Sequence, residues 1–213
     1  KIILVLAFMV SISSFAQRVT PYKGSRIFWD LGSKTTVFTS GNYARMIESK
    51  DGRLIAVAEA LGGISVAFSN NKGTTWTAPK LIASPPSKIF YAVPDVIQLE
   101  DGTILVGLNP RPTSPYNEDR LFGIRVVRST DNGDSWSEPY YVFDAKHTFN
   151  DGCWEPAFLE LPSGEVQCYF ANEGPYTMNN DQEISVCRSF DKGLTWSAPV
   201  TVCYRPGSRD GMP

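Results

Sequence analysis

Short β-rich runs separated by turn sequences recur along most of the chain. Each group has three runs, and a tight-turn pair, Asp51-Gly52, Asp101-Gly102 or Ser163-Gly164, separates the first two. The runs span 45–48, 54–58 and 64–68, then 96–99, 104–108 and 124–128, then 157–161, 166–171 and 184–188. Such turns between short runs are typical of β-hairpins, and no stretch keeps a helical period. The pattern therefore predicts an all-β chain with antiparallel strands.

An eight-residue motif follows the third run of each group. Ser-x-Asp/Asn-x-Gly-x-Ser/Thr-Trp occurs at 69–76, 129–136 and 189–196, with its tryptophans 60 residues apart. A proline and a further apolar run follow each copy, so each unit reads as four strands with the motif as the last turn. Four-stranded units at a fixed long period indicate a β-propeller, with blades near 41–85, 92–144 and 153–204.

The first sixteen residues have the pattern of a secretory signal peptide. Lys1 precedes the apolar run Ile2 to Val10, and the small residues Ser14 and Ala16 suit a peptidase site. The alternative is a buried N-terminal strand. The pattern predicts a secreted or periplasmic protein, and no cysteine near Ala16 offers a lipid anchor.

The composition limits the classes of partner and cofactor that the chain is expected to bind. The 213 residues carry 20 basic and 22 acidic side chains, a net charge of -2, and no basic run that would attract nucleic acid or an anionic membrane. One histidine and no Cys-x-x-Cys leave no conventional zinc site, and we expect no cofactor. The strand pattern places Cys168 opposite Cys187, as a disulfide or as two free thiols.

Antiparallel connectivity brings polar residues together at one rim of such blades. Residues before each first strand and after each second strand meet there, whereas the hairpin turns and the repeated motif lie on the other rim. The candidates are Arg45, Glu59, Asp95, Asn109, Arg111, Trp154, Glu155, Asn172, Glu173, Arg209 and Asp210. Carboxylates with arginines are what glycoside cleavage needs, although each residue alone could equally be a solvated loop residue.

The repeated motif resembles the Asp-box, or bacterial neuraminidase repeat, of the sialidase superfamily of six-bladed propellers. The resemblance implies a structural role for the boxes. It also implies that residues 17–213 are a partial propeller, the N-terminal half of the ring, with 205–213 starting a fourth blade.

Within that superfamily the segments Trp154 to Leu159 and Gly123 to Ser129 are similar to the exo-acting arabinanases. The resemblance implies a secreted, retaining hydrolase that releases terminal arabinofuranosyl units, with Glu155 as nucleophile. Arg45 or Arg209 is expected to face Glu155. The second catalytic carboxylate would lie in a later blade, so this chain alone should be inactive.

Two other functions stay open. An exo-sialidase would need a different first strand, because Tyr43 to Met46 departs from its Arg-Ile-Pro pattern, and the turn Ala60 to Gly63 contains no aspartate. The second open function is that of a non-catalytic propeller that binds a glycan or a protein. In the hydrolase interpretation the partner is an oligosaccharide or polysaccharide, and the full-length protein is a monomer without a membrane anchor.

Overall fold

The computed structural model describes residues 30–213, so the predicted signal peptide lies outside the described residues. The chain divides into two compact units, 1–34 and 35–213. In the described part of the first unit, the 3-10 turn η1 (Leu31–Ser33) is capped by Asp30, whose Oδ1 accepts a hydrogen bond from the Gly32 N–H at 2.9 Å.

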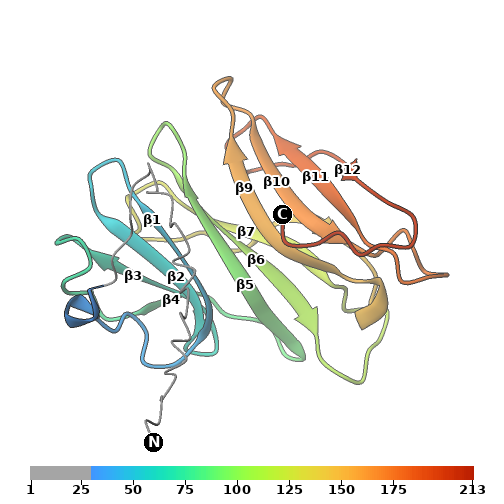
Figure 1. Cartoon of the computed structure of the whole chain (residues 1–213), viewed down its shortest axis with the longest axis horizontal. Helices are drawn as coiled ribbons and strands as arrows, with labels where there is room; N and C mark the ends of the chain where they lie inside the picture. Colours follow the sequence, from blue (N-terminus) through green and yellow to red (C-terminus); the bar gives the residue numbers. More distant parts are fainter. Residues whose placement is uncertain (1–29) are drawn as a thin grey trace, which may run out of the picture. The chain divides into compact units, whose positions relative to one another are not determined.

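The second unit consists of three four-stranded antiparallel sheets, each in chain order (Figure 1), which confirms the predicted all-β blades. Blade one holds β1 (Asn42–Glu48), β2 (Leu54–Ala60), β3 (Gly63–Ser69) and β4 (Lys80–Ala83). Blade two holds β5 (Ile89–Gln98), β6 (Ile104–Pro112), β7 (Gly123–Ser129) and β8 (Tyr140–Asp144). Blade three holds β9 (Cys153–Glu160), β10 (Val166–Asn172), β11 (Glu183–Ser189) and β12 (Val200–Cys203), preceded by the 3-10 turn η2 (Phe149–Asp151).

The apolar faces of neighbouring blades form two cores. Ile55 and Val57 of blade one pack with Ile104 and Val106 of blade two. A second cluster joins blade two to blade three and includes Leu105 and Phe170. Burial of such side chains is the main favourable term in folding, so stacking of the blades stabilises each of them. The inner strands β1, β5 and β9 consequently contact one another in sequence.

The repeated motif forms the turn before the last strand of every blade. Its third residue accepts a hydrogen bond from the backbone N–H four positions later, in the pairs Asn71–Thr75, Asp131–Ser135 and Asp191–Thr195 at 2.8–2.9 Å. Its tryptophan indole donates to the carbonyl of the motif glycine, in Trp76–Gly73, Trp136–Gly133 and Trp196–Gly193 at 3.1–3.2 Å. We call residues 69–76, 129–136 and 189–196 the repeat turns.

The inner strands begin earlier than the hydrophobic pattern predicts. β5 starts at Ile89 rather than near Val96, and β9 at Cys153 rather than Ala157. Each contains a break in register, between Ala92 and Asp95 in β5 and between Trp154 and Ala157 in β9. Pairing resumes beyond these bulges, so Asp95 and Glu155 lie inside strands and not in front of them.

Cys168 does lie opposite Cys187, as the strand pattern predicts. Both thiols are buried and free, so the disulfide alternative does not hold. Burial raises the pKa of Cys187 to about 12, which keeps this thiol protonated near neutral pH.

Candidate active site

A hollow of about 200 Å³ opens at the bulges of the three inner strands. We call it the inner-strand pocket; its lining residues are Arg45, Val93, Asp95, Glu155, Pro156, Ala157, Met212 and Pro213. Three of the eleven predicted site residues, Arg45, Asp95 and Glu155, therefore share one pocket although they are up to 110 residues apart in sequence.

Glu155 lies at a backbone position that the blades repeat. Its φ is +60°, and the corresponding bulge residues Tyr43 and Val93 have φ of +48° and +43°. Met212, which also precedes a proline, has φ of +61°. A left-handed conformation in a residue other than glycine costs roughly 1–3 kcal/mol, so the surrounding sheet must impose it. Glu155 is the only acidic residue among these four, and its carboxylate forms no hydrogen bond or ion pair with side chains or backbone groups of residues 30–213.

Asp95 is held between two blades. Its Oδ2 accepts a hydrogen bond from the Phe158 N–H of β9 at 2.9 Å. Burial raises the pKa of Asp95 above its ordinary value, against the opposing effects of the Phe158 and Val96 N–H groups and the Arg45 charge. The two carboxyl groups of the pocket thus differ, because Asp95 is fixed by a backbone donor and Glu155 is not.

Arg111 is half-buried, and its positive charge is close enough to Glu155 for the two charges to interact. Burial lowers the pKa of Arg111, and the negative charges of Glu59 and Glu155 raise it. Its Nε donates to Asn109 Oδ1 at 2.8 Å, and its guanidinium carbon lies 4.9 Å from the centroid of the Trp154 ring. Arg111 therefore places a positive charge next to the pocket.

Of the two arginines expected to face Glu155, Arg45 shares its pocket, whereas Arg209 pairs with Glu173. The Glu173 carboxylate also accepts a hydrogen bond from the Trp154 indole at 2.8 Å, and burial raises its pKa. The aromatic rings of Phe122 and Phe149 pack against Trp154, with centroids 5.1 and 4.9 Å away. This arrangement fixes the tryptophan on which Arg111 stacks. Arg209 is thus engaged by Glu173, which follows β10, and Arg45 is the candidate that lines the pocket with Glu155.

Four other predicted residues are occupied by contacts within the protein. Glu59 accepts a hydrogen bond from the Val93 N–H at 2.7 Å and so supports the β5 bulge. Asn109 donates to the carbonyls of Gly123 and Cys153 at 2.7 and 3.0 Å. The Asn172 side chain donates a hydrogen bond to Ser185 Oγ and accepts one from the Gly174 N–H. Asp210 forms an ion pair with Arg205 at 2.6 Å. None of the four lines the inner-strand pocket.

Sequence reasoning did not assign to the site the five other lining residues, Val93, Pro156, Ala157, Met212 and Pro213. The signal available was a proline directly after the bulge residue, in Val93-Pro94, Glu155-Pro156 and Met212-Pro213. Proline restricts the residue before it, which suits a special backbone position, but the hydrophobic pattern alone does not distinguish these residues from ordinary core.

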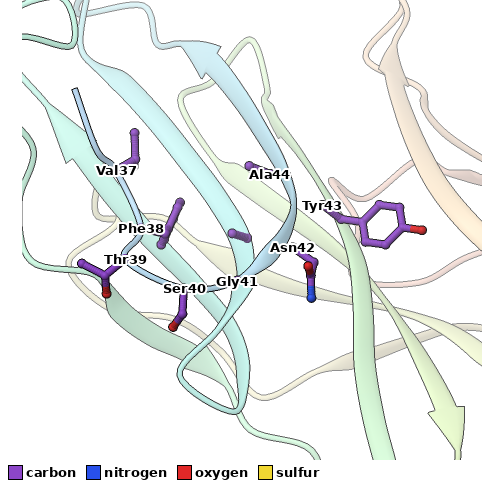
Figure 2. A pocket seen from close by; sticks show the side chains of 9 residues that line it. Val37, Phe38, Thr39, Ser40, Gly41, Asn42, Tyr43 and Ala44 are labelled. Carbon is purple, nitrogen blue, oxygen red and sulfur yellow. The ribbon is translucent and has the colours of Figure 1, made fainter. Parts of the chain in front are cut away.

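A second hollow, of about 440 Å³, lies beside the start of β1 and is lined by Val37 to Ala44 together with Ala58 (Figure 2). None of its lining residues is charged, and the Tyr43 side chain points away from Val37 and Phe38. It offers no acid or base. Within residues 30–213 no three His, Cys, Asp or Glu side chains are grouped to hold a metal ion, and no helix is long and apolar enough to cross a membrane.

The three stacked four-stranded blades have the fold of part of a β-propeller, and solved structures share this fold. The chain resembles a Penicillium chrysogenum α-L-arabinanase bound to arabinobiose at a TM-score of 0.66, with 21% identity over 80% of this chain and 52% of that one. It also resembles a Fusarium graminearum family GH93 α-L-arabinofuranosidase bound to arabinobiose. The TM-score is 0.65, and the identity is 20% over 83% of this chain and 55% of that one.

Among curated proteins, a sialidase of Bacteroides fragilis is 20% identical over 56% of this chain and 26% of its own length. No protein-family model matches the chain. The chain spans about half the length of these two solved neighbours, and about a quarter of the sialidase. At these identities the comparisons establish the fold.

Proposed function

We propose that this chain is part of a secreted, exo-acting glycoside hydrolase that releases terminal arabinofuranosyl units, with Glu155 as its nucleophile. The observation that carries the proposal is the place of Glu155: it lines the inner-strand pocket beside Asp95 and Arg45, and no partner among residues 30–213 occupies its carboxylate. Arg111, which stacks on the neighbouring Trp154, supplies a positive charge beside this carboxylate.

The chemistry takes two steps. The Glu155 carboxylate attacks the anomeric carbon as the glycosidic C–O bond breaks, and a second carboxylic acid gives its proton to the leaving oxygen. Water then gives a proton back to that group and cleaves the glycosyl ester, which frees Glu155. The family resemblance implies that the second group belongs to a later blade. We therefore expect the 213-residue chain alone to be inactive. We also propose that the full-length protein works as a monomer.

Arabinofuranoside is the favoured substrate because the two solved neighbours named above are an arabinanase and an arabinofuranosidase that hold arabinobiose. An exo-sialidase is the second candidate, supported by the Bacteroides fragilis relative. In either case Arg45 and Asp95, which share the pocket, are proposed to bind the sugar. A propeller with only a binding function would hydrolyse neither an arabinofuranoside nor a sialoside.

The direct test measures hydrolysis of aryl arabinofuranoside and aryl sialoside by the full-length protein and by Glu155→Gln. Gln keeps the shape and removes the negative charge, so kcat should fall by at least about a hundredfold while the thermal midpoint is unchanged. Glu100→Gln is the matched control, because the Glu100 side chain is 90% exposed and pairs with Lys50. Activity of Glu155→Gln equal to that of the parent would refute the assignment.

Export is tested separately. N-terminal sequencing of the protein recovered from the medium or periplasm should begin at Gln17 if residues 1–16 are a signal peptide. Recovery of the protein in the cytoplasm with residues 1–16 intact would contradict this proposal.

A further inference from the structure

A cavity of about 320 Å³ lies on blade two, outside the inner-strand pocket. We call it the side cavity, and its polar lining residues are Ser87, Tyr91, Asp119, Arg120 and Arg125. Tyr91 is paired with Pro110 across β5 and β6, next to the pair formed by Phe90 and Arg111. Tyr91 packs with the core that joins blade two to blade one, whereas Arg111 stacks on Trp154 of blade three. Tyr91 and Arg111 therefore lie on opposite faces of blade two.

Tyr91 is the first sign of a ligand. The residue is 7% exposed, and its hydroxyl has no hydrogen-bond partner among residues 30–213. The ring is buried, but the hydroxyl oxygen reaches the open space of the side cavity, where it can donate or accept a hydrogen bond. A bound molecule or solvent is the partner available to it there.

Arg120 is the second sign. Its Nη2 donates to the Pro115 carbonyl at 2.7 Å, but its Nε is buried with no hydrogen-bond partner. Within the described residues Arg120 forms no ion pair. Arg125 differs, since Asp144 neutralises it at a distance of 2.7 Å. The side cavity thus carries one guanidinium that forms no ion pair among residues 30–213, together with the Tyr91 hydroxyl.

The other residues that line the side cavity indicate which kind of anion it would bind. Asp119 is exposed and adds one acceptor, which suits a ligand that also has hydroxyl donors and disfavours a doubly charged phosphate. Ile89, Pro110 and Leu121 supply apolar surface against which a sugar ring can pack. The volume is at the lower end of the range for small-molecule sites.

From this combination we infer that the side cavity is a second binding site, specific for the carboxylate of an acidic sugar. Arg120 and Tyr91 donate to the carboxylate, and Asp119 accepts from a ring hydroxyl. The site is independent of the proposed hydrolysis, because it shares no lining residue with the inner-strand pocket.

Calorimetric titration of the full chain tests the inference, with methyl galacturonoside as the probe and its uncharged methyl ester as the matched control. The acid should bind with a Kd in the millimolar range and the ester at least tenfold more weakly. Acetate should also bind at least tenfold more weakly than the acid, because it lacks hydroxyls. Equal binding of acid and ester, or of acid and acetate, would overturn the inference.

Variants locate the site. Tyr91→Phe removes one hydroxyl and keeps the buried ring, and it should weaken binding of the acid about fivefold to tenfold. Arg120→Gln should weaken it more than tenfold. Lys72→Gln removes the same charge from an exposed repeat turn and should have no effect, and Glu155→Gln should bind as the parent does. Unchanged affinity in both Tyr91→Phe and Arg120→Gln would overturn the inference.

A trigalacturonate titration distinguishes the source of the sugar. Tighter binding than the single sugar assigns the cavity to a uronate unit within a polysaccharide, and equal binding assigns it to a free acidic sugar. Either result is independent of whether Glu155 is catalytic.

Discussion

At the scale of the residue, the two carboxyl groups of the inner-strand pocket have different partners. Asp95 accepts a hydrogen bond from the Phe158 N–H, which joins β5 to β9, and Glu155 has no partner among the described residues. Asp95 is therefore part of the framework of the pocket as well as of its lining. Glu155 is presented by a strained backbone position and is free to contact a ligand.

This difference predicts unequal costs of substitution at position 95. Asp95→Ala should lower the free energy of unfolding by about 1–3 kcal/mol, because the Phe158 N–H is left without an acceptor. Asp95→Asn keeps an acceptor and should lose less. Burial raises the pKa of Asp95, so ionising it costs stability as the pH rises through its folded-state pKa, and Asn avoids that cost at neutral pH. Urea unfolding of both variants provides the comparison, and equal losses would contradict the role of the Phe158 bond.

At the scale of the element, the repeat turns pack against the preceding blade. A Cβ atom on Gly133 would overlap the ring of Phe68, and Gly133 has φ of +93°. Gly102 has a similar φ of +90° but no atom within 4 Å of the same position. The two glycines separate backbone strain from steric contact.

Gly102→Ala should therefore cost only the backbone strain, about 1–2 kcal/mol, because a left-handed alanine is unfavourable. Gly133→Ala adds the overlap with Phe68 and should cost at least 1 kcal/mol more. Thermal and urea unfolding of the two variants measure the difference. A loss at Gly133 no greater than that at Gly102 would show that the turn does not press on blade one.

The charge in the repeat turns predicts a pH effect. Hydrogen bonds from Ser135 and Ser129 hold the pKa of Asp131 at about 2, below its ordinary 3.8. The stability from this carboxylate is present above the ordinary pKa and is lost as the pH falls from about 4 to about 2. Asp131→Asn, which copies Asn71 of the first turn, should make stability less dependent on pH in that window. Parallel acid-unfolding curves for parent and variant would contradict the prediction.

The blades and their bulges show how much of the fold and of the site can be predicted from the sequence. The 60-residue spacing of Trp76, Trp136 and Trp196 predicts the blades, because turn chemistry and strand pattern repeat together. The bulges at Val93 and Glu155 were not predicted, since neither residue type favours φ above zero and the sheet imposes it. Arg111 was predicted at the site, but its proximity to Glu155 depends on how Trp154 is held, which is a tertiary property.

At the scale of the whole molecule, three blades leave apolar side chains on the surface of the outer sheets. Met46 of β1 is 58% exposed, Leu159 of β9 is 47% exposed and Val202 of β12 is 53% exposed. The solved neighbours are about twice as long as this chain. The proposed activity therefore belongs to the whole protein, and its central claim concerns one residue, Glu155.

The most direct measurement of that claim is covalent trapping of the full-length protein with a 2-fluoro arabinofuranoside that carries a good leaving group. A retaining nucleophile forms an ester with such a compound, and the fluorine slows its hydrolysis. Intact mass should rise by one fluorosugar, and peptide mapping should place the label on Glu155. A label on another carboxylate, or turnover of the unfluorinated substrate without any label, would contradict the account.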